Sequence, residues 1–282
     1  MLTNKIDFIA TIEVQNANPN GDPLAGNMPR TDSNGYGMIS DVAIKRKIRN
    51  RMQDEGHEIF VKSRDRIDDG FYSLEKRYSE FFDAKMTDEE IIKGATEKWL
   101  DVRSFGQVIT FQKKSIGIRG PISISIAKSL QPIEISSMQI TRSTNGMETK
   151  NESGRSSDTM GTKHFVEHGV YVIYGSVNAY FSEKTGFSDE DLAVFKTALL
   201  TLFTNDSSSA RPEGSMAIRD IFWFKHSSKL GNVSSAQIRD LFEWSEPTAD
   251  IPSYLDYQIQ LNEEKVKEYE VQGLIVERLT GL

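Results

Sequence analysis

The spacing of apolar residues changes along the chain in a fixed order, and this order restricts the possible folds more than any other feature. Alternation of apolar and polar residues marks a strand, whereas recurrence every three or four residues marks a helix. The two patterns follow one another as strand, helix, strand, strand, helix, strand, over residues 5–14, 41–56, 116–127, 170–181, 188–203 and 216–226. This is the ferredoxin-like order. We therefore predict an α+β fold with an RRM-like, ferredoxin-like sheet at its centre.

Two long segments interrupt this order. Residues 55–115 contain a further predicted helix, because Thr87 and Glu90 form a capping box before an apolar stripe. Residues 128–168 are mostly polar and basic, which is typical either of a protruding hairpin or of a disordered surface loop. RNA-recognition modules have the same strand and helix order and can bind single-stranded RNA on an open sheet face. The order alone does not establish a function.

A long polar loop and a cationic helix stand next to each other near the N-terminus. Residues 15–37 are rich in Asn, Gly, Pro and Asp, and loops of this length are usually functional or disordered. The following helix carries five cations in seven positions, with no acidic residue between 42 and 53: Lys45, Arg46, Lys47, Arg49 and Arg51. A solvated helix face would explain them, but cations without partners beside a glycine-containing loop also suit a phosphate backbone.

Composition limits the classes of protein that this chain can belong to. The 282 residues include no cysteine, which excludes disulfides and cysteine-ligated metal centres. No apolar run approaches the roughly 20 residues of a membrane helix, and the N-terminus does not resemble a signal peptide, so we expect a cytoplasmic protein without a membrane partner. The net charge is -7, but residues 103–163 carry +5 and residues 181–282 carry -7. A polyanion could therefore bind locally.

Motifs of common enzymes are missing from the sequence. There is no P-loop, dinucleotide fingerprint, zinc-protease motif or serine-hydrolase elbow. The four histidines are scattered, and His164 and His168 lie in a segment that we predict to approach a strand. Asp22 and Asp32 in the long loop could bind a divalent ion or act as a base, although Asp in such loops more often caps a turn. We therefore predict no cofactor, no metal and no catalysis.

Several unusual sequence blocks resemble those of one protein family. They are NPNGDPLAGNMPR, SDVAIKRKIRN, DVRSFG, TMGTKH and KTALLTLFTNDSSSAR, at residues 18–30, 40–50, 101–106, 159–164 and 196–211. In this order they resemble the backbone subunit of the type I-C Cascade surveillance complex, the Cas-seven-type group of the RAMP superfamily of CRISPR proteins. Type I-B backbone proteins share part of the pattern.

The resemblance implies a single hand-like domain over residues 1–282. Its RRM-like palm would comprise about 5–54, 116–127 and 169–226, with a finger or web insertion at 55–115, a thumb β-hairpin insertion at 128–168 and a C-terminal extension at 227–282 that packs on the palm. Copies of such a chain form a helical filament along one CRISPR guide RNA and present it in segments to target DNA in antiviral defence. The implied partners are this guide RNA, target DNA, other copies of the chain, the large and small Cascade subunits and the guide-processing endonuclease subunit.

The same resemblance implies roles for individual residues. Lys45, Arg46 and Arg49 would bind guide phosphates, and Asn18, Asn20 and Arg30 lie in the matching loop. Arg103 and Phe105 would contact RNA or shape the finger, with packing an equal alternative for Phe105. In the thumb, Arg142 and Lys163 would meet phosphate, and Met138 or Met160 would wedge beside a displaced base unless it belongs to a core. The acidic C-terminal segment would contact the basic middle of the next copy.

Two other functions stay open at this point. Type III backbone subunits of the superfamily cleave RNA with a metal and an Asp in the loop that corresponds to residues 15–37, where this chain has Asp22 and Asp32. A small-molecule enzyme on a ferredoxin-like fold is the third class, and no cluster of site residues in the sequence favours it.

Overall fold

A computed structural model describes residues 1–141, 160–249 and 252–282. Its main sheet is antiparallel, and hydrogen bonding places the strands in the order β14-β11-β1-β10-β8-β4, while β7 and β9 also pair with β10. The strands are β1 (Ile6–Ala17), β4 (Tyr36–Ile39), β7 (Ile122–Ile124), β8 (Ala127–Pro132), β9 (Ile135–Thr141), β10 (Met160–Val177), β11 (Met216–Lys225) and β14 (Ile275–Thr280). Taking β1, β7/β8, β10 and β11 as the four core strands in chain order, their arrangement is 4-1-3-2. This confirms the predicted ferredoxin-like α+β fold.

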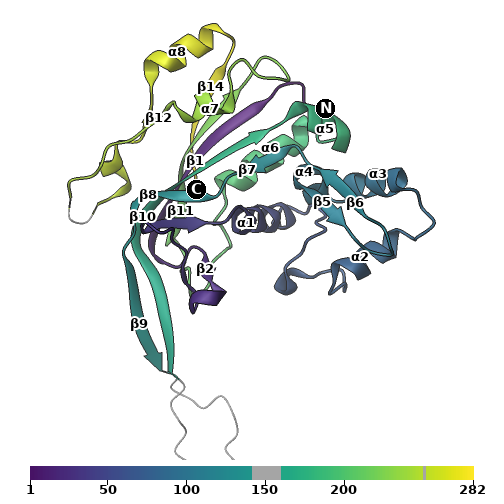
Figure 1. Cartoon of the computed structure of the whole chain (residues 1–282), viewed down its shortest axis with the longest axis horizontal. Coiled ribbons are helices and arrows are strands. Elements are labelled where there is room, and N and C mark those ends of the chain that lie inside the picture. Colours follow the sequence, from purple (N-terminus) through teal and green to yellow (C-terminus); the bar gives the residue numbers. More distant parts are fainter. Residues whose placement is uncertain (142–159, 250–251) are drawn as a thin grey trace, which may run out of the picture.

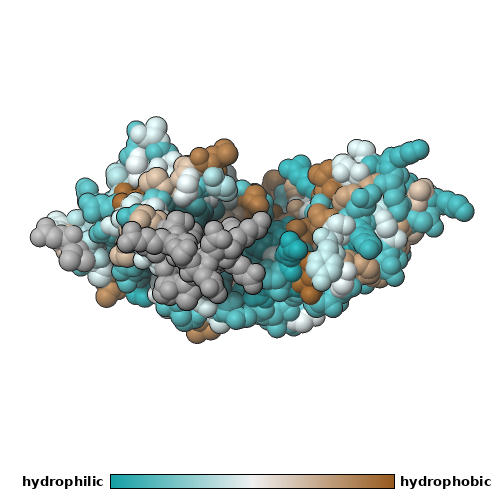
Figure 2. Space-filling model, turned by 90° about the horizontal axis from the view of Figure 1, so that it is seen from below, coloured by the Kyte–Doolittle hydropathy of each residue, from teal (hydrophilic) through white to brown (hydrophobic). Residues whose placement is uncertain are grey.

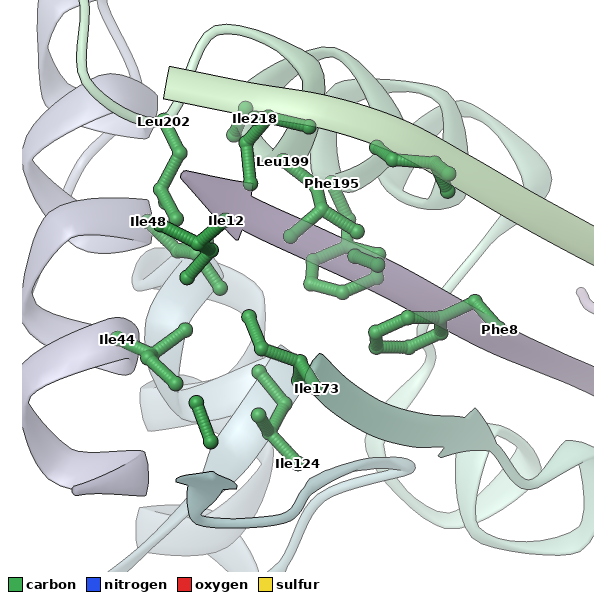
Figure 3. Packing of buried hydrophobic residues seen from close by; sticks show 14 of the residues in the cluster. Phe8, Ile12, Ile44, Ile48, Ile124, Ile173, Phe195, Leu199, Leu202 and Ile218 are labelled. Carbon is green, nitrogen blue, oxygen red and sulfur yellow. The ribbon is translucent and has the colours of Figure 1, made fainter. Parts of the chain in front are cut away.

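Two helices cover one face of the sheet, as their apolar spacing predicts. Helix α1 (Asp41–Asp54) begins at the Ser40 cap, and α6 (Asp189–Leu200) begins at a capping box formed by Ser188 and Asp191. Their apolar stripes meet the alternate residues of the central strands that point to the same side (Figure 3). The buried side chains of this layer include Phe8, Ile12, Ile44, Ile48, Ile173, Phe195, Leu199 and Ile218.

The C-terminal segment covers the opposite face of the sheet. It contains α7 (Ser235–Arg239), β12 (Phe242–Glu243), a 3-10 turn (Tyr254–Tyr257), β13 (Gln260–Leu261) and α8 (Glu263–Val271). Ile9, Phe222 and Phe224 are buried with Ile238 and Tyr254 in a second core. The Tyr254 hydroxyl also donates to Asp220 at 2.5 Å. The sheet face that RNA-recognition modules leave open is therefore closed here by the chain itself.

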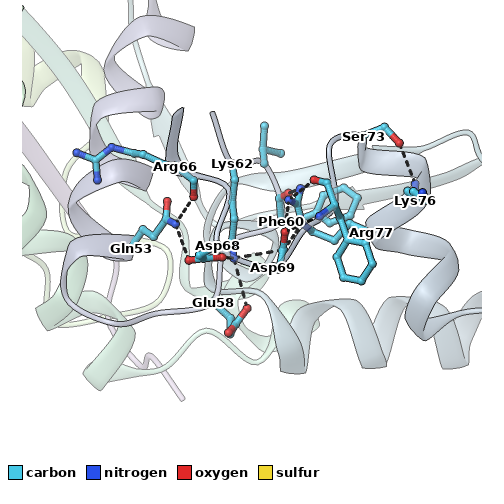
Figure 4. A network of polar contacts seen from close by, with 12 residues as sticks. Gln53, Glu58, Phe60, Lys62, Arg66, Asp68, Asp69, Ser73, Lys76 and Arg77 are labelled. Atoms are coloured by element: carbon cyan, nitrogen blue, oxygen red, sulfur yellow. Dashed lines mark hydrogen bonds and ion pairs between the residues drawn. The ribbon is translucent and has the colours of Figure 1, made fainter. Parts of the chain in front are cut away.

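Residues 58–119 form a lobe beside the sheet (Figure 1). It contains a 3-10 turn (Arg64–Arg66), α2 (Leu74–Phe81), α3 (Asp88–Lys98), α4 (Leu100–Phe105), β5 (Gly106–Ile109) and β6 (Ile116–Arg119). The capping box of Thr87 and Glu90 is present at α3, as predicted. The lobe has its own core, in which the Phe60 and Trp99 rings lie 4.5 Å apart between centroids. A polar network around Arg77 and Lys62 holds its first loop (Figure 4).

Strand β10 runs from the sheet into a projecting hairpin. Its 18 residues pair with β1 over their C-terminal part and with β9 between Met160 and Val166. We call the paired residues 135–141 and 160–166 the hairpin. Figure 1 shows it extending away from the body of the sheet.

The structure differs from the predicted elements at three places. The strand expected at 170–181 ends at Val177, because Asn178 accepts hydrogen bonds from the N–H groups of Tyr180 and Phe181 and starts α5 (Ala179–Thr185). The strand expected at 116–127 is divided into three short strands, β6, β7 and the start of β8. The loop 15–37 contains the tail of β1, a small ladder of β2 (Gly21–Asp22) with β3 (Met28–Pro29), and a turn at Pro23–Ala25. Among the described residues, no helix is long and apolar enough to cross a membrane.

Candidate nucleic-acid interface

A polar groove of about 380 Å³ lies where α1, the long loop and the lobe come together. We call it the groove. Four segments that are distant in sequence line it: residues 19–21, one side of α1, the turn at 63–66, and residues 205–211. In Figure 2 the surface between the body of the sheet and the lobe is hollowed and largely hydrophilic. The side chains that face the groove include the cations Arg46, Lys47, Arg66 and Arg211, the carboxylates Asp65 and Asp206, and the amides Asn20, Asn50 and Asn205.

Arg46 is the groove cation whose charge is least compensated. Ile44 and Ile48 of α1 point into the core. Arg46 lies between them in sequence and therefore projects from the helix beside this apolar stripe. The Nη1 of Arg46 donates to the Val61 carbonyl at 2.6 Å, but no described carboxylate lies within 4.0 Å of it. Burial and the charge of Arg49 both lower the pKa of Arg46. An anion that enters the groove would therefore pair with a cation that is partly removed from water and has no carboxylate partner.

Lys47 is deeper and already has a partner. Only 6% of the residue is exposed, and its ammonium contacts the Asp206 carboxylate and lies 5.3 Å from the centre of the Phe203 ring. Burial lowers the pKa of Lys47, and the charge of Asp206 acts in the opposite direction. Asp206 also lies 3.5 Å from the Nε of Arg211. Two groove cations thus share one carboxylate.

The other cations of the helix are paired with carboxylates, which corrects the expectation that the helix charges lack partners. Arg49 donates to Asp101 at 2.8 Å, and Lys45 contacts Asp41 at 2.9 Å. Arg51 contacts Asp54 at 3.0 Å and Glu55 at 3.6 Å. These partners lie outside the interval 42–53, and Asp101 is 52 residues away from Arg49. Within the described chain, Arg46 is the one cation of this helix that has no carboxylate partner, as predicted for all five.

The loop residues of the resemblance are brought to the start of α1. Asn20 accepts from the Ser40 N–H at 2.9 Å and lines the groove. Asn18 is buried; its Nδ2 donates to the Asn27 carbonyl at 2.7 Å, while its Oδ1 has no hydrogen-bond partner. Arg30 lies 3.4 Å from Asp22. The loop is thus anchored beside the groove, with Asn20 in its wall.

Arg103 and Phe105 make internal contacts. The Nε and Nη2 of Arg103 each donate to Asp191 at 2.8 Å, and its Nη1 donates to the Thr96 carbonyl at 2.6 Å. Burial alone raises the pKa of Asp191, but the hydrogen bonds from Arg103 outweigh it, so the pKa is lowered. The Phe105 ring lies 5.0 Å from the Arg49 guanidinium. These contacts join the lobe to α6 and favour packing over RNA contact for this pair.

The hairpin carries exposed apolar side chains. Met160 is 63% exposed, and Met138 and Ile140 are also exposed, so none of them belongs to a core. Lys163 lies opposite Met138 in the ladder. Arg142 lies outside the described residues.

The aspartates of the long loop hold local structure. Asp22 accepts from the Leu24 N–H at 3.1 Å. Asp32 accepts from the N–H groups of Asn34 and Tyr36 and contacts Lys128 at 2.7 Å. Across residues 1–141, 160–249 and 252–282, no three His, Cys, Asp or Glu side chains gather as a metal site. His164 and His168 lie on β10, which agrees with the strand expected there.

Part of the groove wall was not predicted from the sequence. Asn50, Arg66, Asp206 and Arg211 line it but were not among the predicted site residues. Arg211 and Asp206 belong to the block KTALLTLFTNDSSSAR, so the conspicuous block itself was the available signal. Arg66 carries no comparable signal, because it reaches the groove from the lobe.

The structure thus defines a protein with a ferredoxin-like sheet, a projecting hairpin and a cation-lined groove beside its first helix. A family model described as CRISPR-associated protein Cas7 matches residues 4–262, and the chain belongs to this family. A protein of Haloferax volcanii strain DS2 with the name CRISPR-associated protein Cas7 is 25% identical over 227 residues. The match covers 73% of this chain and 66% of that protein, just under two thirds of its length.

Solved structures share the fold over nearly the whole chain. One chain, from a CRISPR RNA-guided surveillance complex, has a TM-score of 0.54 and 16% identity, with 97% of this chain and 87% of that chain covered. Another, from such a complex described as pre-nicking, has a TM-score of 0.55 and 13% identity, with 95% and 87% covered. At these identities the likeness supports the α+β fold alone.

Proposed function

We propose that this chain is a guide-RNA-binding backbone subunit of a CRISPR surveillance complex, of the type I-C kind, and that it acts by binding rather than by cleaving. Several copies would assemble along one guide RNA and expose it in segments to target DNA, together with the other Cascade subunits. In this proposal the sheet with α1 and α6 is the palm, the lobe is the finger or web, and the hairpin is the thumb.

The main structural support for this proposal is the groove. Arg46, Lys47, Arg66 and Arg211 come from three separate segments and face one cavity of about 380 Å³. Neighbouring amides from Asn20 and Asn50 supply uncharged hydrogen-bonding groups. Guanidinium, ammonium and amide groups are the usual ligands of phosphate oxygens, and such contacts position a nucleic acid without selecting its sequence. A backbone subunit needs this type of contact, because guides differ in sequence.

The covered sheet face supports the groove as the RNA site. In an RNA-recognition module, bases stack on aromatic residues of the open face. Here Phe222 and Phe224 of that face are buried under the C-terminal segment. A guide strand would therefore follow the edge of the palm along α1, which leaves its bases free to pair.

The proposal is tested by guide retention. The chain is expressed with its neighbouring CRISPR genes and a CRISPR array, and RNA that co-purifies is quantified over a salt series. We expect the wild type to retain a discrete guide and the double variant Arg46→Gln/Arg211→Gln to lose most of it. In a direct titration with single-stranded RNA, the salt slope should fall by about 1.4, because each phosphate contact on a single strand contributes roughly 0.7.

A matched variant controls for net charge. Lys93→Gln/Lys267→Gln also removes two positive charges, but both side chains are well exposed and lie outside the groove. Wild-type retention by this control, with loss in the groove variant, would support the proposal. Equal retention by all three proteins, or no RNA with the wild type, would reject it.

A further inference from the structure

The Asp206 carboxylate pairs with two cations of the groove. It contacts the Lys47 ammonium and lies 3.5 Å from the Arg211 Nε, and all three side chains line the groove. Lys47 is buried, and a buried ammonium without an anionic partner is costly. One negative charge at this position is therefore required in the RNA-free chain, and Asp206 supplies it.

A phosphodiester has the same single negative charge as this carboxylate. Either group can neutralise Lys47 and Arg211, but both together would bring two anions into one small site. Like charges in such proximity oppose binding. Carboxylate and phosphate should therefore exclude each other between these two cations.

Asp206 is held mainly by the cations that it neutralises. It lies in the turn segment after α6, and its N–H and carbonyl make no backbone hydrogen bond among the described residues. The segment is anchored on both sides of it instead, since Arg66 donates to the Asn205 carbonyl at 3.3 Å and the Asn18 N–H donates to the Ala210 carbonyl at 2.9 Å. The side chain can thus leave Lys47 without breaking a helix or a strand.

We infer that the space between Lys47 and Arg211 is a phosphodiester-binding subsite, which Asp206 fills as an internal anion in the free chain and vacates when RNA binds. This inference rests on the proposed function, because it assigns a subsite and its ligand class within the same groove. Asp206 would weaken binding of isolated or short anions, since every phosphate that enters must replace it. A long guide binds at many positions at once, so it would most easily offset the free energy needed to displace Asp206.

The test uses Asp206→Asn, which keeps the shape of the side chain and removes its charge. Binding of the full-length chain to a single-stranded polyuridylate of about 30 nucleotides is measured at about 150 mM salt. We expect the variant to bind roughly tenfold more tightly than the wild type, because no carboxylate competes with the phosphate. The melting temperature of its free form should fall, and saturating RNA should raise it again.

Three further variants make the result specific. Asp240→Asn removes one negative charge from an exposed site that has no ion pair among the described residues, and it should change affinity less than twofold. Lys47→Met/Asp206→Asn removes both members of the pair, which protects the fold, and it should lose the gain in affinity. Arg46→Gln should weaken binding in either background.

The outcomes separate this inference from the proposed function. If Arg46→Gln weakens binding while Asp206→Asn leaves it unchanged or weaker, the groove binds RNA but Asp206 is not an internal substitute for phosphate. A structure of the guide-bound chain in which Asp206 still contacts Lys47 would overturn the inference as well. If the wild type binds no RNA, both proposals fail.

Discussion

The lobe and the groove both contain clustered charges, but the charges are satisfied to different degrees. In the lobe, Arg77 donates to both oxygens of Asp69 at 2.7 and 3.0 Å and to two backbone carbonyls at 2.8 Å. Lys62 beside it contacts Asp68 at 2.5 Å and Asp69 at 3.3 Å (Figure 4). In the groove, Arg46 has one carbonyl and no described carboxylate, and the buried Asn50 Oδ1 has no partner. A polar network in which every group has a partner stabilises the fold, whereas a network with unpaired groups can still bind a ligand.

The largest expected effect is the loss of stability on breaking the complete network. Arg77→Met removes the buried guanidinium and leaves Asp69 without its main partner. We expect the free energy of unfolding to fall by about 3 kcal/mol, because the Phe60 and Phe71 carbonyls and the partly exposed Asp69 all lose a charged donor. Thermal unfolding measures this. Lys76→Met, an equal charge change at the exposed neighbouring position of α2, should have little effect. Similar melting temperatures for both variants would show that the network does not support the lobe.

The next effect is a dependence of stability on pH. Hydrogen bonds from Arg77 lower the pKa of Asp69 despite the opposing effect of burial. The group therefore stabilises the folded chain fully above its unfolded pKa of about 3.9, and this contribution is lost as the pH falls through the lower pKa of the folded state. In urea unfolding, the difference between wild type and Arg77→Met should be constant from pH 7 to about pH 5 and should shrink below about pH 4. A difference that stays constant at acidic pH would contradict this assignment.

The smallest effect concerns the incomplete network and has the opposite sign. Asn50→Leu removes a buried oxygen without a partner and replaces Asn by a better helix former. We expect the RNA-free chain to become more stable by about 1 kcal/mol, while its affinity for single-stranded RNA decreases. Chemical denaturation and RNA titration of the same protein test both parts. A variant that is destabilised, or that binds RNA as tightly as the wild type, would show that Asn50 serves the fold rather than the ligand.

Local sequence patterns predicted the central sheet and its helices well. The apolar alternation of β1 and the apolar stripes of α1 and α6 depend on residues that are close in sequence, and the structure contains these elements. The covering of the second sheet face was not predictable in the same way. Its buried residues, such as Ile238, Leu241 and Tyr254, come from turns and from elements too short to show a period.

Charge pairing across long sequence distances explains why the site was predicted only in part. Arg46 and Asn20 were predicted from the resemblance of their sequence blocks, and both line the groove. The partner of Lys47, Asp206, is 159 residues away, and nothing within α1 indicates it. Arg211 is also far from α1 in sequence, so the pattern of the helix does not indicate it either. Only the sheet, which brings α1 and the end of α6 side by side, creates the wall that they share.

The continuity of β10 has a mechanical consequence. A strand of 18 residues is about 60 Å long along its path, and its C-terminal part is hydrogen-bonded to β1 in the middle of the sheet. Strand pairing is continuous from the sheet into the hairpin, because Val166 pairs with both Ala17 and Ile135. The backbone hydrogen bonds of the hairpin thus join those of the main sheet directly. A load applied to the hairpin would therefore pass through backbone hydrogen bonds into the centre of the sheet rather than into a loop.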